Sequence, residues 1–203
     1  MISFKVVTVG SYCVNCVVVS DGEGCIVVDP GQEASRISGL LTELRLKPLA
    51  IVLTHGHFDH IGGLPGLLAS YPGLPVYAHP SDWPMFGHPL NQMPPDYPSV
   101  PRPDNLLDVR RITDDLPDFG IRVLETPGHT PGSVCLNVGD HLISGDTLFA
   151  GSCGRTDFPG GSMASMRKSL ESLAQLPPQT LVIPGHGPST TIGNEVANNP
   201  FMV

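Results

Sequence analysis

The sequence has little positive charge and no long hydrophobic run. Its 203 residues include 11 Lys and Arg against 19 Asp and Glu, which gives a formal charge of −8. Binding to a nucleic-acid backbone requires a clustered basic surface, so nucleic acid is not expected as a partner. No apolar run approaches the roughly 18 residues of a membrane-spanning helix, and residues 1–5 do not begin a signal segment. We therefore expect a cytoplasmic protein that does not bind membranes.

Cysteine is scarce and irregularly spaced. The chain has five: Cys13, Cys16, Cys25, Cys135 and Cys153. An odd number without regular spacing suits a reducing compartment better than a disulfide framework. Cys13 and Cys16 form a C-x-x-C, but there is no second pair for a zinc ribbon and no following helix to activate a thiolate. We interpret these cysteines as structural.

Glycine and proline, by contrast, are abundant. The 23 glycines and 22 prolines lie between apolar runs, so they mark loops and not a disordered tract. With 40% hydrophobic residues, the length suits one globular domain over residues 1–203 that buries a substantial core.

Apolar runs alternate with helical patterns along the chain. Short β-branched runs predict strands at residues 4–9, 14–19, 25–28, 49–53, 76–78, 110–113, 121–125, 133–138, 141–144 and 181–183. Apolar residues at helical spacing predict helices at residues 32–46, 63–70 and 162–176, the last with Ser162 as its N-cap. This order predicts a layered α/β protein with helices on the outer faces of sheets.

Residues 79–103, which we call the proline-rich segment, contain eight prolines and no periodic pattern. A stretch of this length without regular structure is typical of a functional loop. We expect it to lie over the active site, although a passive surface excursion is the alternative.

The chemistry is concentrated in residues 54–60, T-H-G-H-F-D-H, which follow a predicted buried strand. Histidines packed this closely are explained by a cation. His55 and His57 are two apart in an extended segment, so their side chains project to the same side and can share one metal ion. Asp59 and His60 follow a bend and can face a second ion.

A predicted strand that ends in a glycine and a ligand-type residue recurs three times, at His129, Asp146 and His186. Strands that end at one edge of a sheet deliver their terminal residues to one place. Together these residues predict a metal site. His79, His88 and His141 lack this context and are interpreted as structural, with His88 left open because it lies in the proline-rich segment.

These motifs resemble the metallo-β-lactamase-fold superfamily, whose signature is T-H-x-H-x-D-H. The resemblance runs from Asp29 to His186 and implies an α/β fold, a four-layer αββα sandwich of two similar halves. Carried over residue by residue, it implies His55, His57 and His129 on one metal, Asp59, His60 and His186 on a second, and Asp146 as the bridging carboxylate. Asp59 and Asp146 would also act directly in catalysis.

Two divalent ions about 3.5 to 4 Å apart lower the pKa of a bridging water and polarise a carbonyl. The mixed nitrogen and oxygen ligands favour zinc, with iron or manganese as alternatives. Asp29 is either an outer partner that orients a histidine or a turn residue before Pro30.

Residues 144–149, 154–161, 183–188 and 199–202 are similar to the short glyoxalase II-like (hydroxyacylglutathione hydrolase-like) bacterial branch. The resemblance implies hydrolysis of a small-molecule thioester such as S-lactoylglutathione. Full-length glyoxalase II proteins carry a C-terminal glutathione-binding domain, whereas this chain stops shortly after His186, so the thiol is left open. Arg155 is either a substrate-binding residue or a partner of an acidic side chain.

Other reaction classes are left open. Residues 154–158 also resemble persulfide dioxygenases, which would hold one iron through His55, His129 and Asp146. Lactonase, β-lactamase and nuclease activities use the same metal chemistry; a β-lactamase is normally exported, and a nuclease would need basic additions. A binding scaffold without activity would be expected to have lost ligands. The sequence does not predict an oligomeric state.

Overall fold

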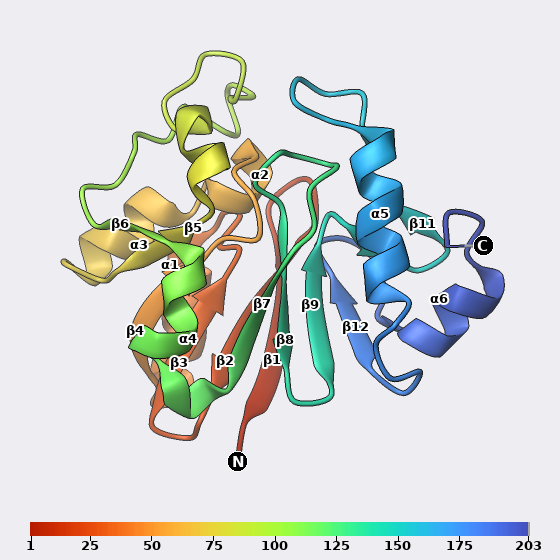
Figure 1. Ribbon diagram of the computed structural model, residues 1–203. Coiled ribbons are helices and arrows are strands. Elements are labelled where there is room, and N and C mark those ends of the chain that lie inside the picture. The colour runs from red at the N-terminus through yellow and green to blue at the C-terminus, as the bar shows by residue number, and fades with distance from the viewer. Residues whose placement is uncertain (203) are drawn as a thin grey trace.

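The computed structural model describes residues 1–202 and contains two main β-sheets that face each other (Figure 1). The first sheet has six strands in chain order: β1 (Ser3–Val9), β2 (Val14–Ser20), β3 (Gly24–Val28), β4 (Lys47–Val52), β5 (Val76–Ala78) and β6 (Leu106–Asp108). β1, β2 and β3 pair antiparallel, whereas β3 to β6 are parallel.

The second sheet has five strands in the order β13-β12-β9-β8-β7: β7 (Ile121–Glu125), β8 (Val134–Val138), β9 (His141–Gly145), β12 (Leu181–Pro184) and β13 (Thr190–Thr191). β9 and β12 run parallel, and a two-stranded hairpin of β10 (Leu148–Phe149) and β11 (Ser152–Cys153) follows β9.

Six α-helices complete the structure: α1 (Ala34–Glu43), α2 (Phe58–Ile61), α3 (Leu64–Ser70), α4 (Ile112–Asp115), α5 (Met163–Leu173) and α6 (Ile192–Asn198). Three 3₁₀ turns, at Pro80–Met85, Val109–Arg111 and Pro117–Phe119, lie between them. Within residues 1–202, none of the helices has the length and apolar character needed to cross a bilayer.

The alternation of side chains along the strands explains the four layers. In β2 every residue is buried; Val14, Cys16 and Val18 face the helices α1 and α3, while Val17 and Val19 face the second sheet. Because successive side chains of a strand point to opposite faces, such a strand must be covered on both sides.

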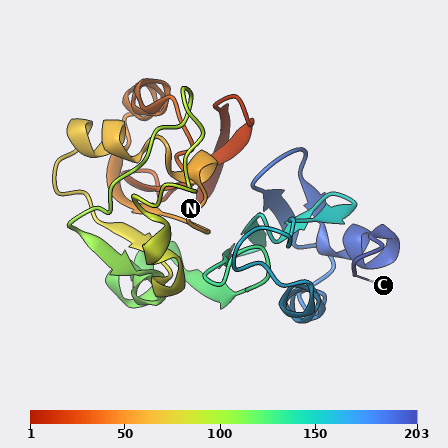
Figure 2. The ribbon, with the colours of Figure 1, turned by 90° about the horizontal axis from the view of Figure 1, so that it is seen from above.

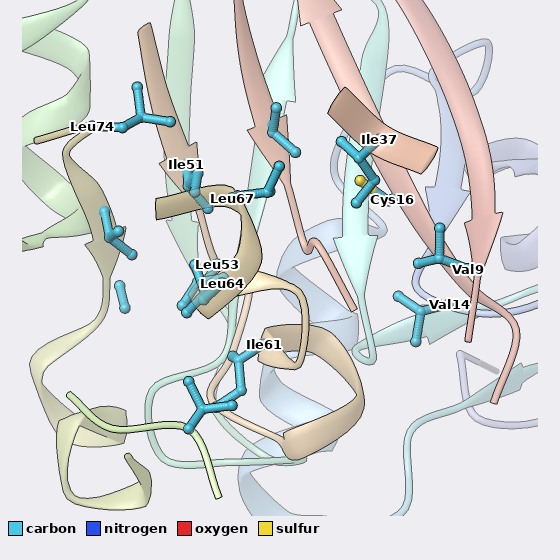
Figure 3. Packing of buried hydrophobic residues seen from close by; sticks show 14 of the residues in the cluster. Val9, Val14, Cys16, Ile37, Ile51, Leu53, Ile61, Leu64, Leu67 and Leu74 are labelled. Carbon is cyan, nitrogen blue, oxygen red and sulfur yellow. The ribbon is translucent and has the colours of Figure 1, made fainter. Parts of the chain in front are cut away.

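The remaining strands also alternate between side chains that face the outer helices and side chains that face the opposite sheet. The outer core between the first sheet and its helices is shown in Figure 3, where Ile37 and Leu67 pack against Cys16 and Ile51. On the second sheet, Cys135, Leu142 and Val182 face α5, and their neighbours in sequence face the inner core. Viewed from above, the two halves of the chain lie on opposite sides of the molecule (Figure 2). The predicted αββα sandwich is confirmed.

The strand predicted at residues 110–113 is wrong. β6 ends at Asp108, whose carboxylate accepts a hydrogen bond from the Arg110 amide and starts the turn Val109–Arg111, which leads into α4. Val109 and Ile112 are both buried in the inner core. Their spacing of three suits a helical turn, not the alternation of a strand.

Most other predicted elements exist with shifted ends. The helix predicted at residues 32–46 is shorter, since Glu33 and Arg45 adopt positive φ values of 54° and 57° on either side of α1. The predicted N-cap of α5 is confirmed, because the Ser162 hydroxyl accepts a hydrogen bond of 3.2 Å from the Ser165 amide. The sequence did not predict β6, α2, α6, β13 or the β10–β11 hairpin.

Candidate metal centre

The seven residues expected as ligands meet at one edge of the sandwich. His55, His57, Asp59 and His60 follow the carboxyl end of β4, His129 follows β7, Asp146 follows β9 and His186 follows β12. β9 and β12 are parallel, and β7 is antiparallel to β8, which is antiparallel to β9. The carboxyl ends of these three strands therefore lie on one side, at the top of Figure 1.

Three histidines form the first cluster. One ring nitrogen from each of His55, His57 and His129 lies within 4.8 Å of the other two. His57 Nδ1 and His129 Nε2 are 2.8 Å apart. A second cluster, with the same mutual limit, contains Asp59, His60 and His186. Here His60 Nε2 lies 3.2 Å from His186 Nε2, which in turn lies 3.4 Å from Asp59 Oδ2.

Asp146 lies between the two clusters. Its carboxylate oxygens are 3.5 Å from His129 Nε2 in the first cluster, and 3.3 Å and 3.6 Å from the Nε2 atoms of His60 and His186 in the second. This is the position that a carboxylate shared between two ions must occupy.

Asp29 orients two of the histidines. Its Oδ1 accepts a 2.8 Å hydrogen bond from the Thr54 amide, and its Oδ2 accepts from the Thr54 hydroxyl at 2.6 Å and from His60 Nδ1 at 2.9 Å. Because that hydroxyl donates to Asp29, it accepts from His55 Nδ1, 3.1 Å away. In the neutral rings of His55 and His60, Nε2 is then the nitrogen that carries the lone pair. Of the two roles open for Asp29, the structure gives the orienting one.

Backbone carbonyls orient two further histidines, His129 and His186. His129 Nδ1 lies 2.7 Å from the carbonyl oxygen of Arg155, and His186 Nδ1 lies 2.9 Å from that of Tyr12. A carbonyl can only accept, so both Nδ1 atoms are protonated and both Nε2 atoms present lone pairs to the site. Gly154 is required beside them, because a Cβ there would overlap the carbonyl oxygen of Asp146.

The residues present fit divalent metal ions. His55 Nε2 and Asp146 Oδ1 are buried and have no hydrogen-bond partner among the described residues. Buried polar atoms without partners are rare in proteins, and an ion satisfies both of these. A Cβ at Gly185 would collide with Asp146 Oδ1, so the chain leaves this space to the ligands. Imidazole and carboxylate ligands with hydrogen-bonded outer atoms are typical of zinc and iron sites.

The charges of the site also suit cations. Burial and the neighbouring histidines lower the pKa of His55 well below its ordinary value and that of His57 to about 4, so both stay neutral. Burial alone would raise the pKa values of Asp59 and Asp146, but the charged forms of His60 and His186 outweigh it and both carboxylates remain ionised. Burial alone would lower the pKa values of His60 and His186, but the surrounding carboxylates outweigh it and raise both. Metal binding needs neutral imidazole and ionised carboxylate, so an ion would displace the Nε2 protons of these two rings.

Two side chains of the proline-rich segment support the ligand loops, and neither was predicted from the sequence. The buried Asp82 carboxylate accepts hydrogen bonds from the Gly56 amide at 2.9 Å, the Thr130 hydroxyl at 2.7 Å and the Gly132 amide at 2.8 Å. Gly56 lies between His55 and His57, and Thr130 follows His129. Asp82 therefore connects the loops that carry the first cluster.

Asn91 is the second of these residues. Its amide donates to the Gly56 and Met85 carbonyls at 2.8 and 3.1 Å, and its oxygen accepts from the Phe58 amide at 3.0 Å. Isolated Asp and Asn residues among prolines suggest turns, whereas the partners of Asp82 and Asn91 in the ligand loops lie 26 to 50 residues away in sequence.

A cavity of about 620 Å³ opens onto the two clusters. His57, Asp59, His129, Asp146 and His186 reach its wall, whereas His55 and His60 are buried behind it. The proline-rich segment contributes Pro84, Met85, His88, Leu90 and Asn91 to the lining. The proline-rich segment therefore lies beside the metal centre, in agreement with the prediction that it covers the active site.

Arg155 also lines this cavity, but its side chain pairs with Asp157. The guanidinium donates to both carboxylate oxygens at 2.9 and 2.7 Å and lies 4.3 Å above the Phe158 ring. Of the two roles left open for Arg155, the structure thus shows the pairing with an acidic side chain. The Arg155 backbone carbonyl, not its side chain, orients the ligand-type residue His129.

The histidines outside the motif have structural contacts, as predicted. His79 accepts a hydrogen bond from the Ser81 amide, and His141 stacks on Phe4 at 3.9 Å. His88, left open, lines the cavity. Among the cysteines, Cys16, Cys25 and Cys135 are buried as expected of structural residues, Cys153 is half-buried in the cavity wall, and Cys13 is exposed.

Comparison with known proteins gives consistent results. The model of the "Metallo-beta-lactamase superfamily" matches residues 12–186. The chain is 37% identical to "Probable metallo-hydrolase YqgX" of Bacillus subtilis, with 96% and 94% of the two chains covered, and 31% identical to "Hydroxyacylglutathione hydrolase GloC" of Haemophilus influenzae, with 98% of each covered.

Two solved structures are similarly close. TTHA1623 in a di-iron-bound form shares 40% identity at a TM-score of 0.85, with 97% of this chain and 99% of that chain covered. BLEG-1 B3 metallo-beta-lactamase shares 36% identity at a TM-score of 0.89, with 98% and 99% covered.

Proposed function

Because the chain belongs to the metallo-beta-lactamase superfamily, we propose that it is a metal-dependent hydrolase that cleaves acyl thioesters. The observation that carries this proposal is the set of lone pairs in the centre. The outer nitrogens of His55, His60, His129 and His186 are all engaged, so their inner nitrogens are free to bind metal. The similarity to the Haemophilus hydroxyacylglutathione hydrolase supports a thioester as the substrate.

His55, His57 and His129 would hold one divalent ion, and Asp59, His60 and His186 the other, with Asp146 shared. When bound, such ions supply hydroxide near neutral pH and polarise a carbonyl. The donors suit zinc, and the di-iron form of the TTHA1623 structure supports iron as an equal alternative. Metal analysis of the purified protein distinguishes the two.

The chain's own residues bring the substrate to this place. Asp59 and Asp146 are ionised and line the cavity, so they can hold the attacking water and accept its hydrogen bonds. The water oxygen bonds to the carbonyl carbon and gives up a proton to solvent, the C–S bond breaks, and the sulfur leaves with the bonding electron pair; the carboxylic acid that forms then ionises. A thiolate leaves readily without a proton, so no general acid is required of the cavity wall.

The test is hydrolysis of S-lactoylglutathione and simple acyl thioesters by protein of known metal content, followed by titration of the released thiol. We expect turnover that chelation abolishes and that added zinc or iron restores. Turnover that survives complete removal of metal, or none with two ions bound, would contradict the proposal.

β-Lactam hydrolysis is a second candidate, favoured by the similarity to the BLEG-1 structure along the whole chain. A chromogenic cephalosporin tested beside the thioesters decides between them through the ratio of kcat/KM values. The persulfide dioxygenase alternative predicts one iron per chain and oxygen uptake with glutathione persulfide. The nearness of Asp59, His60 and His186 favours a second metal ion instead.

A further inference from the structure

The wall of the cavity outside the metal centre is mostly apolar. Tyr12, Phe58, Met85, Leu90, Phe149 and Phe158 contribute to it. Three of these are notably exposed: Leu90 at 79%, Tyr12 at 44% and Phe158 at 39%. Exposed large apolar side chains that gather at one opening usually mark a surface that binds apolar groups.

The cavity offers little to a charged substrate. Among the described residues that line it, Arg155 carries the one guanidinium or ammonium group, and Asp157 already pairs with it. The Asn91 amide is likewise engaged, with the Gly56 and Met85 carbonyls. The other polar side chains of the wall outside the metal centre are Tyr12, His88 and Ser152. A glutathione thioester brings two carboxylates, which would lie against this mostly apolar wall without a free guanidinium or ammonium partner, and such contacts are unfavourable.

We infer that the substrate is a thioester with a neutral thiol part and an apolar acyl chain, and that glutathione is not the thiol. This inference rests on the proposed thioesterase function and names the substrate class of the same site. The acyl chain packs against the aromatic wall and Leu90, while the thioester carbonyl reaches the metal centre.

Chain length gives the expected magnitude. Each buried methylene contributes about 0.8 kcal/mol, which corresponds to about fourfold in kcat/KM. Because the cavity is open to solvent, burial is incomplete. From propanoyl to hexanoyl on N-acetylcysteamine, we expect kcat/KM to rise at least about tenfold. At equal acyl chain, the N-acetylcysteamine thioester should exceed the glutathione thioester by a similar factor.

Leu90→Glu tests the wall directly. At 79% exposure the side chain contributes little to folding, so the variant should keep parental stability. It should lose about tenfold in kcat/KM for hexanoyl-N-acetylcysteamine and much less for the propanoyl substrate. Leu44→Glu is the matched control, since Leu44 is 41% exposed at the end of α1 and does not line the cavity.

A binding measurement separates this inference from the proposed function. S-hexyl-N-acetylcysteamine and S-hexylglutathione are thioethers, which cannot be hydrolysed, and calorimetry gives their affinities for the metal-loaded protein. Tighter binding of the N-acetylcysteamine compound supports the inference even if no thioester is cleaved, which would overturn thioesterase activity alone. Faster cleavage of S-lactoylglutathione than of hexanoyl-N-acetylcysteamine, or equal loss of activity in Leu90→Glu and Leu44→Glu, would overturn the inference and leave thioesterase activity intact.

Discussion

Replacement of Asp82 should weaken one metal site more than the other. Asp82 accepts three buried hydrogen bonds from the loops that carry His55, His57 and His129. His60 of the second cluster is held by Asp29 instead, which also reaches His55 through the Thr54 hydroxyl. Loss of Asp82 should therefore loosen the first cluster and leave the second in place.

The magnitude follows from the hydrogen bonds. Each bond to an ionised acceptor contributes about 1.5 to 3 kcal/mol, and a buried amide left without a partner costs about 1 to 3 kcal/mol. Burial raises the pKa of Asp82, against the lowering effect of its hydrogen bonds, so the loss of its desolvation cost offsets part of this. We expect Asp82→Ala to lose about 3 kcal/mol of unfolding free energy.

Asp82→Asn is the milder variant, because its amide keeps one acceptor oxygen. The Asn Nδ2 can donate to the Thr130 hydroxyl but faces the Gly56 amide as a second donor. We expect a loss of about 1 to 2 kcal/mol. Asp114→Asn is the control, an exposed aspartate on α4 whose replacement should leave stability unchanged.

The assay combines urea denaturation with chelator titration. Asp82→Asn should release one metal ion at a chelator concentration at which the parent keeps both. Asp29→Asn should lower the affinity for both ions, because Asp29 supports His60 directly and His55 through Thr54. If Asp82→Asn lowers stability while both ions stay bound with parental affinity, Asp82 supports the scaffold and does not position the ligands.

Four further outcomes are expected. Asp146→Ala should bind at most one metal ion per chain and lose most of the hydrolytic activity, which metal analysis and thiol release measure together. Gly185→Ala places a Cβ against the Asp146 carboxylate, and a ligand displaced by about 1 Å should lower kcat by about a hundredfold while the protein stays folded. Removal of both ions should lower the melting temperature, because each ion contributes about 4 kcal/mol of stability when its concentration exceeds its Kd a thousandfold. Burial alone would raise the pKa of Glu195, but hydrogen bonds from four residues lower it below 4.5, so its contribution to stability is present above that pH and is lost as the pH falls. Glu195→Gln should flatten the acid limb of a stability-pH curve, and the exposed Glu43→Gln should not.

The ligands could be predicted from the sequence because each follows a strand that is itself easy to recognise. His129, Asp146 and His186 come after β-branched, apolar runs, and the ends of such runs meet at one edge of the sandwich. The family resemblance also assigned these residues to two metal ions. The two clusters in the structure match that assignment.

The features that could not be predicted from the sequence depend on contacts between residues far apart in the chain. Residues 110–113 look like a strand because they contain β-branched side chains, but the Asp108 carboxylate turns the chain and Val109 and Ile112 then pack as a helical turn. Asp82 finds its partners up to 50 residues further along the chain. No local pattern encodes such a pairing, so the sequence alone could place the ligands but not their supports.

The proline-rich segment combines two tasks that usually belong to different parts of a protein. Asp82 and Asn91 face inward and hold the loop of the metal motif, while Met85 and Leu90 face the cavity. Prolines restrict the backbone between these positions, which lowers the entropy lost on folding. A segment fixed by its inward residues leaves its cavity residues free to vary without moving the ligands. Substitutions at Leu90 should therefore change the choice of substrate and leave metal affinity unchanged, whereas substitutions at Asn91 should change metal affinity.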